Sequence, residues 1–174
     1  ERKMGYRHKI IDRKGGFTII ELVMVIVLIA IMAALAIPKF DSYYAIKLGG
    51  AARKLLFDIR YAQRLAIAQH DSYGVEFNTA ANTYRIYKVS DNSTAIEPLS
   101  RSSFLVDYTA NTEFKDIDIT SVNFGGTTKI AFSSLGVPKN GSGVDLSVNG
   151  TVTISYKGSS QTITVIPNTG KASL

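Results

Sequence analysis

The chain of 174 residues contains no cysteine and only two histidines, His8 and His70. Disulfide frameworks, thiolate metal sites and cysteine nucleophiles all need cysteine, so the sequence excludes all three. Serine and threonine are plentiful, but they fall in turns and strand faces with no local nucleophile motif. His70 follows a helical pattern, where we expect it to end the helix. We therefore predict a protein that is not an enzyme and that carries no cofactor or metal.

Positive charge is concentrated at the start of the chain. The net charge is +6, and residues 1–16 hold six Lys or Arg and two acids, which is +4. The other 158 residues carry only +2. The overall charge therefore gives no argument for a nucleic-acid partner, because most of it lies in a segment that we expect to be removed.

Residues 17–37 lack glycine and proline, and Glu21 is their only charge. At about 1.5 Å per residue, such a helix would be roughly 30 Å long, the thickness of a bilayer's hydrocarbon core. We predict a transmembrane helix here. Because the basic residues precede it, residues 1–16 should stay cytoplasmic, and the chain after Pro38 should be exported.

Two kinds of processing compete for this segment. Ala34-Leu35-Ala36 fits a secretory cleavage site, which would release a soluble binding protein or enzyme. Alternatively, the chain is cut before the apolar run and keeps the helix as an anchor. A run of about 20 apolar residues is longer than the usual secretory h-region of about 7–15, which favours the second interpretation.

The segment Gly15-Gly16-Phe17-Thr18-Ile19-Ile20-Glu21 resembles the class III signal of type IV prepilins and type II secretion pseudopilins. The resemblance implies cleavage after Gly16 by a prepilin peptidase, and N-methylation of Phe17. It also implies a membrane-embedded subunit that an inner-membrane platform assembles with other pilin-like subunits. Glu21 stands fifth after the cut, and Pro38 stands at the twenty-second position, where relatives often have proline. Ala30 departs from the glycine that many members carry.

Glu21 has a physical role that fits this resemblance. A carboxylate in hydrocarbon costs on the order of 3 kcal/mol. Cleavage would create an α-amino cation on Phe17, which could pair with Glu21 of another subunit when the helices stack. We therefore expect Glu21→Ala to impair assembly and leave the folding of the exported domain intact.

Residues 38–70 continue as an amphipathic helix that Pro38 and Gly49-Gly50 should weaken. Apolar residues at 3–4 spacing mark one face: Leu48, Ala52, Leu55, Ile59, Ala62 and Ala66. The opposite face holds Arg53, Arg60 and Arg64. These arginines suit DNA phosphates, but a solvated face or a contact with neighbouring subunits is the simpler interpretation.

Residues 71–174 have the period-2 pattern of a β-rich domain. Alternation predicts strands near the following ranges: 75–77, 83–89, 117–124, 129–132, 144–148, 152–156 and 162–166. Asn149-Gly150 and 157–160 are expected turns, and 91–103 an expected loop. The fold class is therefore α+β, with one long N-terminal helix packed on an antiparallel sheet.

Three segments of this half resemble the GspH/FimT group of minor pilins and pseudopilins: 51–77, 130–136 and 163–171. The resemblance implies a low-abundance subunit near a filament tip or a priming complex. Some members bind DNA through a basic C-terminal motif. Here that end is Gly170-Lys171-Ala172-Ser173-Leu174, with a single basic residue, Lys171. DNA binding in uptake therefore remains the alternative to a purely structural subunit.

Two further patterns suggest ligands only superficially. Asp116 and Asp118 could share a strand face near a calcium ion, but two acids without further oxygen ligands make a weak site. Gly125-Gly126-Thr127-Thr128-Lys129 lacks phosphate-loop spacing and is expected to be a turn.

Overall fold

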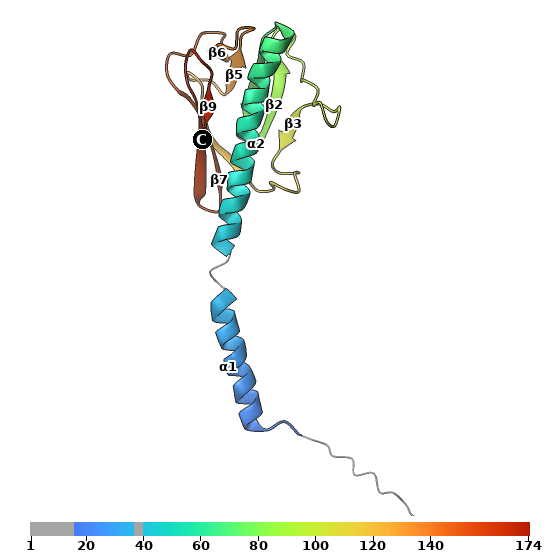
Figure 1. Cartoon of the computed structure of the whole chain (residues 1–174), viewed down its shortest axis with the longest axis vertical. Coiled ribbons are helices and arrows are strands. Elements are labelled where there is room, and N and C mark those ends of the chain that lie inside the picture. The colour runs from blue at the N-terminus through green and yellow to red at the C-terminus, as the bar shows by residue number, and fades with distance from the viewer. Residues whose placement is uncertain (1–15, 37–39) are drawn as a thin grey trace, which may run out of the picture. The chain divides into compact units, whose positions relative to one another are not determined.

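The computed structural model describes residues 16–36 and 40–174, and the chain divides into two compact units between Phe40 and Asp41. In the first unit, helix α1 (Ile19–Ala36) begins after Thr18, whose Oγ1 accepts a hydrogen bond of 3.3 Å from the backbone N–H of Glu21 (Figure 1). This is the N-cap geometry of a helix start.

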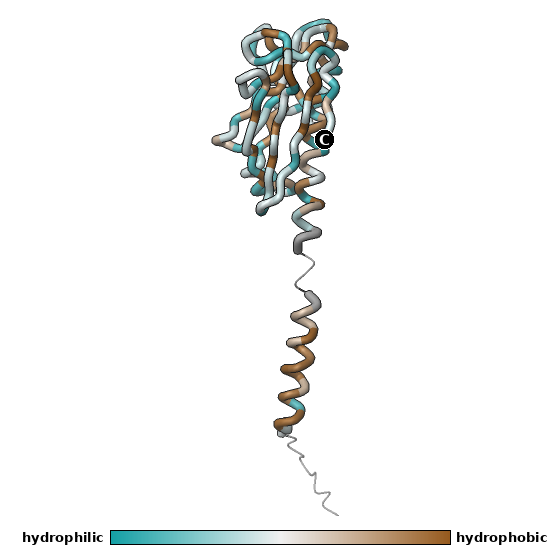
Figure 2. Tube along the Cα trace, turned by 90° about the vertical axis from the view of Figure 1, so that its left-hand side faces the viewer, coloured by the Kyte–Doolittle hydropathy of each residue, from teal (hydrophilic) through white to brown (hydrophobic). Residues whose placement is uncertain are grey.

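Apart from Glu21 in its first turn, helix α1 is apolar on all sides (Figure 2). Its large side chains, from Ile19 to Met32, are exposed. Among the described residues, no helix combines the length and hydrophobicity needed to cross a membrane. Helix α1 starts two residues later than the predicted span 17–37 and ends at Ala36. Residue 37 lies outside the described part of the chain.

Helix α2 (Phe40–Gln69) starts the second unit and runs through Gly49-Gly50 without a break. The expected weakening of the helix there stays a prediction. Phe114 lies close to the second glycine, because a Cβ on Gly50 would lie 3.2 Å from its ring. At its end, the N–H groups of His70 and Asp71 donate to the carbonyls of Ile67 and Ala66. With φ 51°, His70 closes a Schellman motif and confirms its role as helix terminator.

Two antiparallel sheets complete this unit (Figure 1). One has the order β3-β2-β1-β5-β6 and the other the order β4-β7-β8-β9. The strand bounds are β1 (Tyr73–Asn78), β2 (Thr83–Lys88), β3 (Leu105–Asp107), β4 (Asp118–Asn123), β5 (Lys129–Phe132), β6 (Pro138–Asn140), β7 (Gly150–Tyr156), β8 (Ser159–Val165) and β9 (Ala172–Ser173).

The core lies between α2 and the sheets. All six apolar residues predicted for the inner face of the helix are at most 2% exposed. They belong to one cluster with side chains of both sheets, such as Ile86 and Ile154. The α+β prediction is confirmed, although the sheet expected as one is divided into two.

The strand predicted at 144–148, and the hairpin turn at Asn149-Gly150, are wrong. Of the three alternating apolar residues, only Leu146 is buried, while Val144 and Val148 are about 60% exposed. The side chain of Asn140 accepts hydrogen bonds from the N–H groups of Ser142 and Val144, which holds a loop in place. Strand β7 begins at Gly150 itself.

Candidate functional site

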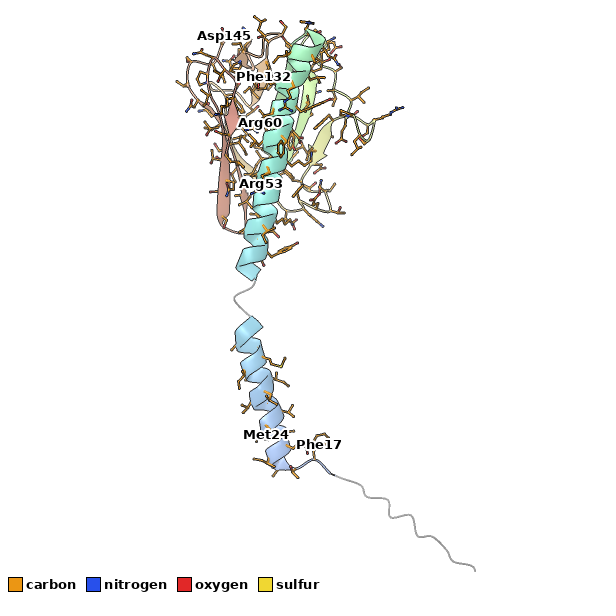
Figure 3. The ribbon with its side chains drawn as sticks, in the orientation of Figure 1. Phe17, Met24, Arg53, Arg60, Phe132 and Asp145 are labelled. Carbon is orange, nitrogen blue, oxygen red and sulfur yellow. The ribbon has the colours of Figure 1, made fainter. Side chains whose placement is uncertain are left out.

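The prepilin-like segment lies at the start of α1. Phe17 is 81% exposed (Figure 3). Glu21 stands in the first helical turn, where the helix dipole favours a negative charge. Thr18 and Glu21 have the spacing of a capping box, and half of that box is formed, because Thr18 accepts the N–H of Glu21. Gly16 precedes the helix in a segment without regular secondary structure. Gly15 and Pro38 lie outside the described residues.

The arginines of α2 differ in their environments. Arg53 and Arg64 are exposed, as the amphipathic pattern predicts. Arg60 is half-buried, and its Nε and Nη2 donate hydrogen bonds of 3.2 and 2.7 Å to the carbonyl oxygen of Ala172 in β9 (Figure 3 labels Arg53 and Arg60). Arg60 therefore ties the C-terminal strand to the helix.

The fold brings three of the four predicted cationic residues together. Arg60, Arg64 and Lys171 line one open surface pocket with Gln63, Thr169 and Ala172. Lys171 comes from the turn after β8, more than 100 residues along the chain. Arg53 lies two helical turns before Arg60 and is outside this pocket. The pocket can accept an anionic group, because exposed cations line its wall.

Gln63 joins the three segments that resemble the GspH/FimT group. Its Nε2 donates hydrogen bonds of 2.9 Å to the carbonyls of both Gly136 and Thr169. Gly136 and Gly170 adopt φ of 80° and 64°, a region that glycine tolerates best. A Cβ on Gly170 would lie 2.5 Å from Nε2 of Gln63 and 2.9 Å from the oxygen of Gly136. The motif glycines thus permit the close approach of two turns to α2.

Asp58 is the buried charged residue of the described core. Its carboxylate accepts hydrogen bonds from the Tyr84 hydroxyl at 2.6 Å and the Lys54 ammonium at 2.9 Å. Burial raises the pKa of Asp58, although the hydrogen bonds from Tyr84 and Lys54 oppose this shift. Burial also raises the pKa of Tyr84, so its hydroxyl stays protonated as the donor.

The predicted geometry of Asp116 and Asp118 is wrong. Asp116 sits in a turn with φ 66°, before β4 starts at Asp118. Asp118 instead accepts a hydrogen bond from Nδ2 of Asn82. The described residues hold no group of three or more acids, histidines or cysteines placed to bind a metal. Gly125 and Gly126, with φ of 61° and 81°, form the predicted turn between β4 and β5.

Sequence reasoning missed Gln63 and Asp58. Gln63 follows the buried Ala62 directly, but nothing in the sequence shows that two distant carbonyls reach it. Asp58 carried one usable signal, since it lies between the buried residues Leu55 and Ile59 and four residues after Lys54. An acid at that edge of an apolar face needs a polar partner across the interface.

Comparisons with known proteins agree with this arrangement. A family profile described as the prokaryotic N-terminal methylation motif matches residues 11–37, and one described as type II transport protein GspH matches residues 51–170. No curated protein matches the chain. Among solved structures, the chain is similar to the type IV minor pilin FimU of Pseudomonas aeruginosa strain PAO1, at 14% identity and a TM-score of 0.50. The match covers 75% of this chain and 89% of FimU, and it shows a shared fold.

The GspH profile covers more than half of the chain and contains the Gln63 junction and all but the last strand. It also contains the pocket residues other than Lys171 and Ala172. The methylation motif covers the prepilin-like segment 15–21 and the apolar run, and it is the motif of membrane-anchored pilin-like proteins. Proteins of these families are structural subunits and not enzymes. The chain therefore belongs to the GspH family, and it is a subunit of a type IV pilus or a type II secretion pseudopilus that assembles with other pilin-like subunits.

Proposed function

We propose that this subunit is made as a prepilin, cut after Gly16, methylated on Phe17 and assembled through its N-terminal helix. The observation that carries the proposal is the position of Gly16-Phe17 directly before α1, with Glu21 in the first turn of that helix. A peptidase needs an accessible, extended bond, and residues 16–18 have no helical structure. The exposed side chain of Phe17 would then head the apolar helix.

The proposed organisation has four parts: a leader at 1–16, an anchor at 17–37, an amphipathic helix at 38–70 and an exported β-rich domain at 71–174. The basic leader would remain in the cytoplasm by the positive-inside rule. Lipid would surround the anchor in the bacterial inner membrane until the assembly platform extracts the subunit. Prepilin peptidase and that platform are thus its proposed processing partners, and neighbouring helices would replace lipid in the filament.

Charge pairing is the proposed driving force for correct register. The new amine of Phe17 in one subunit would approach the carboxylate of Glu21 in another, and a buried charge is tolerated when it is paired. An unpaired Glu21 would penalise a helix that stacks one turn out of register. The role of Glu21 is therefore in assembly, and the second unit should fold without it.

The mature N-terminus tests this proposal. Mass spectrometry of the protein from its native membrane should find N-methylated Phe17 as the first residue. A terminus at Ile37 would mean that Ala34-Leu35-Ala36 is a secretory cleavage site and that the apolar run is discarded. That result would contradict assembly through the helix.

DNA binding in uptake is the second candidate function, and the convergence of Arg60, Arg64 and Lys171 on one pocket supports it. The use of two guanidinium nitrogens of Arg60 by Ala172 argues against it, because fewer donors remain for phosphates. The detergent-solubilised chain should show a salt-dependent DNA shift, lost on Arg64→Glu with Lys171→Glu, if this function is correct.

A further inference from the structure

The exposed side of α2 carries a narrow stripe of apolar and cationic side chains, here called the ridge: Ile46, Arg53, Phe57 and Arg64. At about 100° per residue, these four lie within about 20° of one line along the helix. Ile46 is 75% exposed and Phe57 61% exposed. Aromatic and arginine side chains dominate the binding energy of protein interfaces, so this composition is typical of a docking surface.

A second surface of the same unit has the opposite charge. Residues 107–118, here called the rim, connect β3 to β4 and contain four acids and one base: Asp107, Glu113, Asp116, Asp118 and Lys115. Their sum is −3. By contrast, the described side chains of α2 include one acid, Asp58, which is buried. The ridge and the rim are therefore electrostatically complementary, which favours association and sets its register.

The rim cannot reach the far end of the ridge in its own chain. Near the start of α2, Lys47 donates a hydrogen bond to the carbonyl of Lys115, and Gly50 lies against Phe114. Arg64 lies 17 residues after Lys47, which is about 26 Å along the helix. A rim that contacts Arg64 must therefore belong to another molecule, displaced along the helix axis.

We propose that the ridge of one subunit docks on the rim of a second copy of this chain, head to tail. This proposal rests on the proposed function, because a filament needs a heterologous contact in which each subunit presents two different surfaces. Phe57 would be covered by the docked rim, with Arg53 and Arg64 pairing with rim carboxylates on either side. The interface adds a contact between globular domains to the packing of the N-terminal helices.

The absence of cysteine allows a specific test in the full chain. Ala68→Cys places a thiol one turn beyond Arg64, and Thr112→Cys places one in the rim, both at exposed positions that leave every charge intact. The two variants are co-expressed in the native bacterium without the wild-type copy, and the assembled fraction is treated with a bismaleimide. We expect a cross-linked dimer from the mixture and none from either variant alone.

Charge reversal should control this cross-link. Arg53→Glu with Arg64→Glu in the Ala68→Cys chain should lower the yield at least tenfold, and Glu113→Lys with Asp116→Lys in the Thr112→Cys chain should restore it. Arg101→Glu, on the exposed loop between β2 and β3, is the matched control and should leave the yield unchanged. If Arg101→Glu lowered the yield of the cross-linked dimer as much as the ridge substitutions do, the result would contradict a contact made by the ridge.

Other outcomes separate this interface from the function on which it rests. Assembled chain without a mixed cross-link overturns the interface alone, as does a dimer from one variant by itself or a cross-link to a different subunit. A DNA shift that needs Arg64, with no mixed cross-link, would assign the ridge to nucleic acid. Absence of the chain from the assembled fraction overturns the proposed function and the interface together.

Discussion

The hydroxyl of Tyr84 in β2 donates a hydrogen bond of 2.6 Å to the carboxylate of Asp58 in α2, inside the apolar layer between the helix and the five-stranded sheet. Lys54 approaches the same oxygen from one helical turn earlier. A buried carboxylate with fixed partners allows few alternative positions for the helix on the sheet. The pair therefore fixes the position of α2 along its axis relative to strand β2. Because the ridge lies on α2, the pair also fixes the ridge relative to the rest of the domain.

The pH dependence of stability should report on Asp58. Because burial raises its pKa above 3.8 in the folded chain, protonation stabilises the folded state relative to the unfolded state. That contribution is complete below the unfolded pKa of about 3.8 and is lost as the pH rises through the folded pKa. Relative to Asp58→Asn, the wild-type free energy of unfolding should therefore fall as the pH increases across this window. Denaturant unfolding of the detergent-solubilised chain, followed by near-ultraviolet circular dichroism, measures it; parallel curves would contradict a raised pKa.

Gly170→Ala should be more destabilising than its backbone conformation alone explains. Both Gly170 and Gly126 have positive φ, but a Cβ on Gly126 meets nothing within 4 Å. Gly126→Ala should cost about 1–2 kcal/mol for the left-handed backbone. Gly170→Ala should cost about 1–3 kcal/mol more, because it displaces Gln63 and the Gly136 carbonyl. Equal losses in the free energy of unfolding would show that the two turns tolerate the extra atom.

The helix face and the strand pairs with a local signal were predictable from the sequence. Positions such as Leu55 and Ile59 follow the helical period, and the turn at Lys157-Gly158, with φ of 49° and 86°, fits a two-residue hairpin between β7 and β8. Alternation failed at 144–148, because the same pattern also fits a loop that buries only Leu146. Strands β3, β6 and β9 have two or three residues, too few for a period.

Contacts between distant segments were beyond the reach of sequence patterns. The pattern placed Arg60 with Arg53 and Arg64 on one face, but its bonds to Ala172 depend on where the last strand returns to the helix. The same holds for Gln63, whose acceptors lie 73 and 106 residues away. The segments that resemble the GspH/FimT group marked these places without showing that they meet.

Arg60→Ala should loosen the C-terminal strand. It removes two charged donors from the carbonyl of Ala172, worth about 1.5–3 kcal/mol, and β9 has only two ladder residues to hold it. Hydrogen exchange at the amides of 172–174 should become roughly tenfold faster or more, with little change in the buried strand β1. Arg53→Ala is the matched control, because it removes an exposed arginine from the same helix. Equal acceleration by both variants would show that the effect is a general loss of helix charge.

Glu21 has two possible roles that substitutions can separate. It stands at the third position of α1, where a carboxylate completes a capping box with Thr18, and it would also pair with the amine of Phe17 in a neighbouring subunit. Thr18→Ala removes the cap, at about 1 kcal/mol, and leaves the carboxylate in place. Glu21→Ala removes the carboxylate, and the loss of one partner of a buried pair costs about 3–5 kcal/mol.

If Glu21 acts in pairing, Thr18→Ala should still enter the assembled fraction, and Glu21→Ala should be largely absent from it. Both variants should retain the wild-type free energy of unfolding of the second unit, since neither side chain contacts it in the proposed mechanism. Immunoblots of sheared filament or pseudopilus fractions, normalised to total chain, measure the partition. Equal loss of both variants would make the start of the helix, and not the charge, the requirement for assembly. The cap acts within one subunit, whereas the charge pair acts between two subunits. The comparison therefore also decides whether the loss of the Glu21 carboxylate impairs the folding of α1 or its packing against a neighbouring subunit.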